Sequence, residues 1–120
     1  MTKRVLIIEG DDDLRELMVA CLGDAGYAVR ACRSHADALA RLAEDRVELV
    51  VADTESRAPA SAWTGVLALR AAAGPTPILL TTGHGFDASD VRAAGFAGLL
   101  PKPFDLDALE ARARTTLAQS

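Results

Sequence analysis

The chain has 120 residues, of which 50% are hydrophobic and 25% are charged, and its formal net charge at pH 7 is −4. This composition is typical of a single globular domain over residues 1–120 and argues against a disordered protein. The acidic balance, without any basic stripe, argues against direct binding of nucleic acid, and no apolar run is long enough to span a membrane.

The start of the chain predicts a buried strand followed by an amphipathic helix. Val5–Ile8 is a continuous apolar run, which is typical of a strand buried on both faces. Asp12 and Asp13 suit the first turn of the next helix, where acids complement the helix dipole. This helix is expected to end at Gly23 or Gly26, and its apolar stripe comprises Leu14, Leu17, Met18, Cys21 and Leu22.

The next segment predicts a strand over Tyr27–Cys32 and a second helix. Ser34 begins this helix with Asp37 three residues later, which is close to a capping box. Leu39 and Leu42 form its apolar stripe.

The rest of the chain repeats the alternation of strands and helices. Trp63, Val66, Leu67 and Arg70 mark a helix that Gly74 and Pro75 stop, and Trp63 is interpreted as partly buried packing rather than a partner contact. The other expected elements are a third strand over Val47–Ala52, a fourth over Ile78–Leu80, a short helix over Ser89–Ala94, a fifth strand over Gly98–Leu100 and a last helix capped by Asp105.

This alternation predicts a doubly wound α/β fold with a parallel sheet and right-handed crossovers. Ligands of such sheets bind at the carboxyl ends of the strands. The polar residues expected at those ends are Glu9, Gly10, Asp11, Asp53, Thr81, Thr82 and Lys102.

Carboxylates gathered from separate strands repel one another, and proteins keep them together where a cation sits among them. Oxygen ligands without His or Cys indicate a hard ion, Mg²⁺ first. A metal-bound carboxylate beside a hydroxyl and a lysine suits phosphoryl transfer, with Asp53 as the nucleophile. Asp11 has two interpretations, a helix N-cap or a metal ligand.

The stretches VLIIEGDDDLREL, VELVVAD, TPILLTTGHG and GFAGLLPKPF resemble the receiver domain of two-component response regulators, and the similarity covers essentially the whole chain. The resemblance implies a (βα)5 flavodoxin-like fold with strand order 2-1-3-4-5, and a signalling module rather than an enzyme. It implies that Asp53 is the phosphoacceptor, Thr82 the switch hydroxyl and Lys102 the phosphate-pairing lysine. It also implies a cis Lys102–Pro103 peptide and a Mg²⁺ ion held by Glu9, Asp11, Asp53 and the backbone carbonyl of Glu55.

The resemblance further implies phosphorylation by a histidine kinase or a histidine phosphotransfer protein. A downstream protein partner is expected on the face formed by the helix near 89–94, the strand near 98–100 and the helix after residue 105. No effector domain is expected in these residues, and neither nucleic acid nor membrane is an expected direct partner. A monomer or weak homodimer is expected, and a cytoplasmic location fits a start without a signal-peptide segment and a reduced core Cys21.

The chain departs from the family pattern around the predicted site. Gly10 stands where the family has the second of two adjacent acids, the one that touches the metal. Leu99 stands where the family usually has Tyr or Phe, and the segment after Asp53 is longer than usual before its glycine. These departures predict a divergent member and leave an alternative, a degenerate receiver that acts as a phosphorylation-independent interaction module. An enzyme on the same scaffold is a third, weaker alternative, and His84 is expected to be an exposed loop residue.

Overall fold

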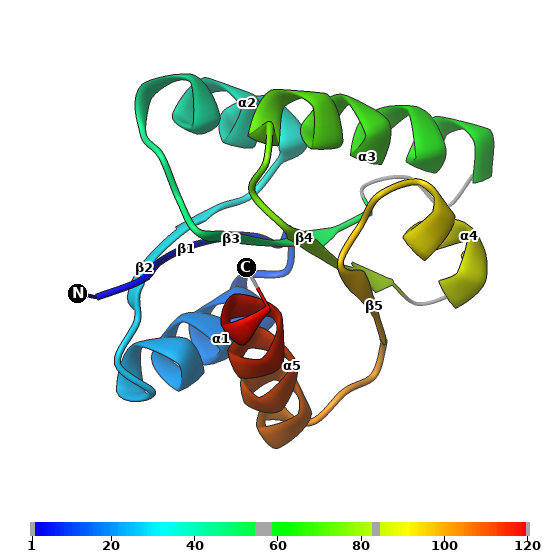
Figure 1. Ribbon diagram of the computed structural model, residues 1–120. Coiled ribbons are helices and arrows are strands. Elements are labelled where there is room, and N and C mark those ends of the chain that lie inside the picture. The colour runs from blue at the N-terminus through cyan, green and yellow to red at the C-terminus, as the bar shows by residue number, and fades with distance from the viewer. Residues whose placement is uncertain (1, 55–58, 83–84, 120) are drawn as a thin grey trace.

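The computed structural model describes residues 2–54, 59–82 and 85–119, within which strands and helices alternate (Figure 1). The elements are β1 (Arg4–Ile8), α1 (Asp12–Asp24), β2 (Ala28–Cys32), α2 (His35–Glu44), β3 (Leu49–Asp53), α3 (Pro59–Ala73), β4 (Ile78–Thr82), α4 (Ala88–Ala93), β5 (Gly98–Pro101) and α5 (Leu106–Ala118). The strands pair in parallel in the order β2-β1-β3-β4-β5. The predicted doubly wound, flavodoxin-like fold and its strand order are therefore confirmed.

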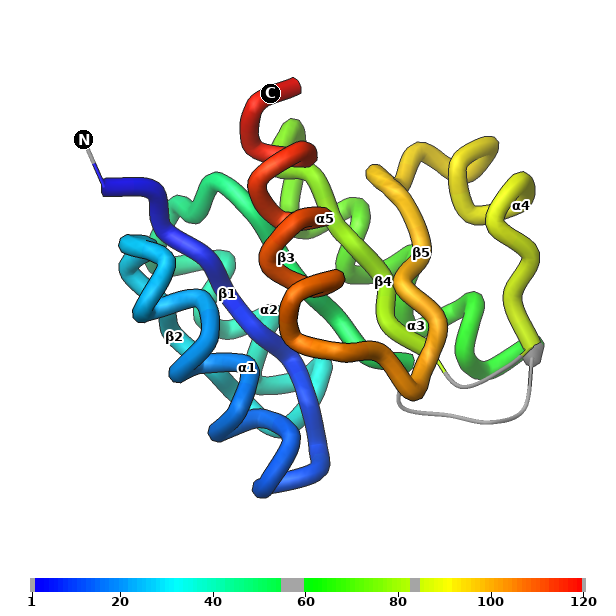
Figure 2. Tube along the Cα trace, turned by 90° about the horizontal axis from the view of Figure 1, so that it is seen from below, coloured from blue at the N-terminus to red at the C-terminus, as the bar shows by residue number. Residues whose placement is uncertain are grey.

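Helices cover both faces of the sheet. α1 and α5 lie on one face and α2 and α3 on the other, while α4 lies beside β5 (Figures 1 and 2). Successive strand residues point to opposite faces, so Val50 packs toward α2 and α3 and its neighbour Val51 toward α1 and α5. Because both faces are filled with apolar side chains, polar function is confined to the ends and edges of the strands.

The strands extend further toward the candidate site than the sequence predicts. β3 begins at Leu49 rather than Val47 and includes Asp53, and β4 runs through Thr82 rather than stopping at Leu80. Asp53 and Thr81 are partners in the β3–β4 register, so pairing between the two strands continues to the level of the polar residues. Asp53 and Thr82 therefore stand at the ends of paired strands rather than on the loops that follow.

Most helix starts follow the predicted capping. The Ser34 hydroxyl accepts a hydrogen bond from the Asp37 amide at 3.1 Å, and Asp105 accepts one from the Ala108 amide at 2.7 Å. α4 begins one residue earlier than predicted because Asp87 caps it, accepting from the amide of Ser89 at 2.8 Å.

The predicted apolar stripes are wrong at three leucines. Leu17, Leu39 and Leu67 are 53%, 37% and 46% exposed, although their helical spacing matches that of buried neighbours. Periodicity defines the side of a helix, but the width of the covered stripe depends on how closely the helix lies on the sheet. Cys21 is likewise only partly buried, and its thiol donates to the carbonyl of Leu106.

Trp63 is partly buried and packs against Phe86 with ring centroids 4.8 Å apart, which confirms its interpretation as packing. His84 and Glu55 lie outside the described residues. Within the described ranges, no helix combines the length and the apolar character that crossing a bilayer requires.

α2 and α3 meet where His35, the first residue of α2, faces Gly65 of α3. A Cβ atom at position 65 would lie 3.0 Å from Nδ1 of His35, which is closer than ordinary van der Waals contact. Gly65 therefore makes room for the imidazole, at the cost that glycine brings to a helix interior.

We expect the effect of Gly65→Ala on the free energy of unfolding to depend on which residue occupies position 35. Alanine is favoured over glycine in a helix by roughly 1 kcal/mol, so Gly65→Ala should raise the free energy of unfolding by about that amount when His35 is alanine. In the wild-type background the crowding should cancel or reverse this gain. Urea unfolding of the four proteins measures the difference, and Gly23→Ala, whose Cβ would meet nothing within 4 Å, is the control. An equal gain from Gly65→Ala in both backgrounds would contradict the contact.

Candidate functional site

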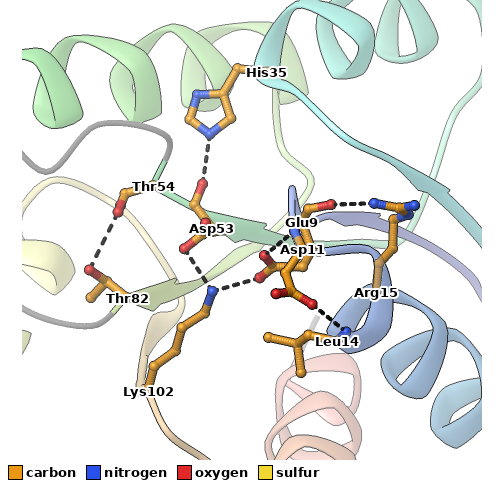
Figure 3. Close-up of polar contacts among 9 residues, drawn as sticks. All are labelled: Glu9, Asp11, Leu14, Arg15, His35, Asp53, Thr54, Thr82 and Lys102. Atoms are coloured by element: carbon orange, nitrogen blue, oxygen red, sulfur yellow. Dashed lines mark hydrogen bonds and ion pairs between the residues drawn. The ribbon is translucent and has the colours of Figure 1, made fainter.

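The carboxyl ends of four parallel strands bring together side chains that are far apart in the sequence (Figure 3). Glu9 follows β1, Asp53 ends β3, Thr82 ends β4 and Lys102 follows β5. Glu9 and Lys102 are 93 residues apart in the chain and in direct contact in the fold. The gathering predicted from the sequence is therefore present for these residues.

Lys102 joins the two carboxylates. Its Nζ lies 2.6 Å from Oε1 of Glu9 and 3.1 Å from Oδ1 of Asp53. The Glu9 side chain is 3% exposed, whereas those of Asp53 and Lys102 are 22% and 23% exposed. The buried carboxylate of Glu9 thus holds the ammonium of Lys102, and the carboxylate of Asp53 is the more exposed partner of that ammonium.

Backbone contacts place Glu9 and Lys102. The Glu9 amide donates to the carbonyl of Cys32 at 3.1 Å, which continues the pairing of β1 with β2, and its carbonyl accepts from Arg15 at 3.0 Å. The Lys102 amide donates to the carbonyl of Thr82 at 2.7 Å, which continues the pairing of β5 with β4. The Lys102–Pro103 peptide is cis, as predicted.

Burial and neighbouring charges shift the pKa values of Asp53 and Lys102. Burial raises the pKa of Asp53 and the negative charge of Glu9 raises it further, while Lys102 and a backbone hydrogen bond from Thr54 oppose the rise. Burial alone would lower the pKa of Lys102, but hydrogen bonds and charges from Glu9 and Asp53 outweigh it, so that pKa is raised. The lysine stays protonated, and an ionised Asp53 is held at a free-energy cost.

Asp11 and Gly10 occupy the turn between β1 and α1. Asp11 is the N-cap of α1: its Oδ1 accepts from the Leu14 amide at 2.8 Å, and its own amide donates to Oε2 of Glu9 at 3.0 Å. Capping occupies one carboxylate oxygen, and a metal-binding role for Asp11 stays a prediction. A Cβ on Gly10 would have a single near neighbour, the Arg33 carbonyl at 3.6 Å, so the turn has room for a side chain there.

Hydroxyl groups lie on the β4 side of the site. Thr82 is buried, and its Oγ1 lies 3.4 Å from Oγ1 of Thr54. Thr81 is completely buried, and its hydroxyl has no hydrogen-bond partner in the part of the chain that the structure describes. Leu99 packs against the core on the side of α2 and α3.

Sequence reasoning missed two residues of the site. His35 is buried, and its Nε2 lies 2.7 Å from the backbone carbonyl of Asp53, so Nε2 carries the proton and donates. Thr54 places its hydroxyl against Thr82. In the sequence, His35 is marked only by its position after the Ser34 cap. That position does not predict a contact with Asp53, 18 residues away in the chain.

The described residues offer few ligands for Mg²⁺. No group of three or more His, Cys, Asp or Glu side chains within residues 2–54, 59–82 and 85–119 lies close enough together to hold an ion. The two acids that share Lys102, Glu9 and Asp53, are hard oxygen donors, and Mg²⁺ in proteins is commonly held by one or two carboxylates, with water and phosphate oxygens completing its shell. The side chains of Glu9 and Asp53 are therefore of the type that binds Mg²⁺. The site has one carboxylate fewer than it would have with an acid at position 10.

Comparisons with known proteins agree on one family. Residues 5–114 match the model for the response regulator receiver domain. The chain is 34% identical over 125 aligned positions to response regulator MprA of Mycobacterium bovis, and the match covers 100% of this chain and 53% of that protein. The chain thus spans about half the length of this curated relative.

Solved structures agree with this result. The chemotaxis response regulator CheY4 of Vibrio cholerae matches with a TM-score of 0.82 and 25% identity, over 97% of this chain and 99% of that one. The receiver domain of Francisella response regulator 1452 shares the fold, with a TM-score of 0.85 and 17% identity over 98% of each chain.

We expect the ionised form of Asp53 to destabilise the folded protein. Because the folded protein raises the pKa of this group above its usual value of 3.8, the folded state binds a proton there more readily than the unfolded chain. The contribution of Asp53 to the free energy of unfolding therefore falls as pH rises from the usual pKa through the pKa in the folded state. This loss of stability persists at neutral pH. Asp53→Asn removes it and should raise Tm by roughly 2–5 °C at neutral pH.

The gain from Asp53→Asn should shrink as pH falls below the usual carboxyl pKa, since the wild-type group is then protonated in both states. Thermal unfolding followed by circular dichroism across pH measures this. Glu16→Gln, an exposed change of equal charge on α1, should show no such pattern. An unchanged or lower Tm for Asp53→Asn at neutral pH would refute the inference that folding raises the pKa of Asp53.

Proposed function

The chain belongs to the response regulator receiver domain family, and on that premise we propose that it is a signalling module controlled by phosphorylation of Asp53. The observation that carries the proposal is the contact of Lys102 with both Asp53 and the buried Glu9. It puts a protonated amine beside an accessible carboxylate, which is the arrangement that receiving a phosphoryl group requires.

In the proposed reaction, an ionised oxygen of Asp53 attacks the phosphorus of a phosphohistidine or a small phosphoryl donor. The new P–O bond forms as the bond from phosphorus to the leaving group breaks, and the leaving group keeps the electron pair and takes a proton from solvent. Lys102 compensates the charge of the phosphoryl oxygens, and Glu9 holds the ammonium in place. Glu9 and Asp53, with Asp11 and the Glu55 carbonyl as further predicted ligands, would hold Mg²⁺, which supplies additional charge neutralisation when bound.

The response of the fold is proposed to begin at Thr82. Its hydroxyl, which contacts Thr54 in the structure, is positioned at the end of β4 beside the strand that carries Lys102. Turning this hydroxyl toward a phosphoryl oxygen would shift contacts along β4 and β5. A downstream protein partner would then bind the surface of α4, β5 and α5.

The proposed partners follow from the family. A histidine kinase or a histidine phosphotransfer protein supplies the phosphoryl group, and the module acts in the cytoplasm as a monomer or weak homodimer without contacting nucleic acid or membrane itself. A phosphorylation-independent interaction module is less well supported, because the phosphoacceptor, the lysine and the hydroxyl are all present at the strand ends. Gly10 is the feature that speaks for it.

Incubation with acetyl phosphate and Mg²⁺ tests the proposal. We expect intact-mass spectrometry to show the gain of one phosphoryl group on the wild type, because Asp53 is accessible and paired with Lys102. The gain should disappear in Asp53→Ala and persist in Asp13→Ala, which removes an exposed acid of the first turn of α1. No gain on the wild type, or an equal gain on Asp53→Ala, would count against the proposal.

A second experiment asks whether Gly10 limits metal binding. Gly10→Asp adds a carboxylate in a turn with room for it, and we expect it to tighten Mg²⁺ binding by at least about tenfold through the added charge and ligand. Titration calorimetry measures the affinity. Gly23→Asp on α1 makes the same change of charge away from the site and should leave the affinity unchanged. If Gly10→Asp binds Mg²⁺ no more tightly than Gly23→Asp does, the result would favour a phosphorylation-independent interaction module.

A further inference from the structure

One peptide unit at the end of β3 lies between His35 and the carboxylate of Asp53. On one side, the Nε2–H of the buried His35 donates to the carbonyl oxygen of Asp53 at 2.7 Å (Figure 3). On the other side, the amide of Thr54 opposes the rise in the pKa of the Asp53 carboxylate. Both groups belong to the peptide that joins residues 53 and 54.

A peptide unit is planar and rigid, so its carbonyl and its N–H cannot rotate independently. In the trans form the two groups point in opposite directions. A donor that fixes the carbonyl oxygen therefore fixes the direction of the N–H as well. A carbonyl that accepts a hydrogen bond also polarises its own amide and strengthens the N–H as a donor.

We propose that His35 is a positioning residue that fixes the peptide between Asp53 and Thr54 so that its N–H faces the carboxylate that accepts the phosphoryl group. The inference rests on the proposed function, because it assigns His35 a role in the reaction of Asp53. His35 touches no reacting atom and acts through the peptide.

The surroundings of His35 leave its ring little freedom. Ser34 caps α2 and so places residue 35 in the first turn. Gly65 of α3 presents no side chain to the ring, and a Cβ there would lie 3.0 Å from Nδ1. The end of β3, the start of α2 and the interior of α3 thus meet at one imidazole, and a change in the packing of α2 against α3 would reach the phosphoacceptor through it.

Two substitutions separate the hydrogen bond from the packing. His35→Gln keeps an N–H donor about where Nε2 lies, and His35→Leu keeps an apolar side chain but removes the donor. We expect His35→Leu to raise the pKa of Asp53, read from the ¹³C shift of its carboxyl group. We also expect it to slow phosphorylation by acetyl phosphate by roughly threefold to tenfold. His35→Gln should remain close to the wild type in both measurements.

Leu42→Ala on α2 is the control for stability. Leu42 packs against the same core but its variant should lower Tm without moving the pKa of Asp53. Equal losses in His35→Gln and His35→Leu, or no loss in either, would overturn the inference while phosphorylation of the wild type upholds the proposed function. A shifted pKa without a slower rate would also overturn it. A wild type that accepts no phosphoryl group would refute both, and that failure is visible before any variant is made.

Discussion

The contact of one ammonium with two carboxylates is the interaction on which the rest of the site depends. Glu9 is nearly dry, and a buried carboxylate is tolerated only when a partner of opposite charge neutralises it. Lys102 provides that charge and, in doing so, is held beside Asp53. Burial, together with the negative charge of Glu9, raises the pKa of Asp53, which is the more exposed of the two acids.

The parallel sheet makes this arrangement possible. With both faces covered by helices, the only places where several strands present polar groups together are the strand ends, and the order β2-β1-β3-β4-β5 puts β1 and β3 side by side. Pairing that continues to Asp53 and Thr81, and backbone hydrogen bonds from Glu9 and Lys102, carry the rigidity of the sheet into the site. The site is thus built on paired backbone and capped helix starts.

The departures from the family pattern now have a structural meaning. Gly10 leaves room in the β1–α1 turn where a carboxylate would otherwise stand, and the adjacent Asp11 caps α1. Leu99 is partly buried against the core and offers no aromatic ring to Thr82, whose hydroxyl contacts Thr54. His35 of α2 adds a hydrogen bond to the backbone carbonyl of Asp53. The chain therefore keeps Asp53 and its lysine, and it differs from the family pattern in the β1–α1 turn and at the position of Leu99.

The sequence by itself determined the alternation of elements, the caps at Ser34 and Asp105, and the presence of Glu9, Asp53 and Lys102 at strand ends, because these depend on local periodicity and on residues a few positions apart. Only the tertiary structure decided that Leu17 faces solvent and that β3 and β4 extend as far as they do. It also decided that His35 reaches the carbonyl of Asp53. The exposure of Leu17 and the contact of His35 depend on how closely a helix lies on the sheet. The strand ends depend on pairing with neighbouring strands, and in each case the partners are far away in the chain.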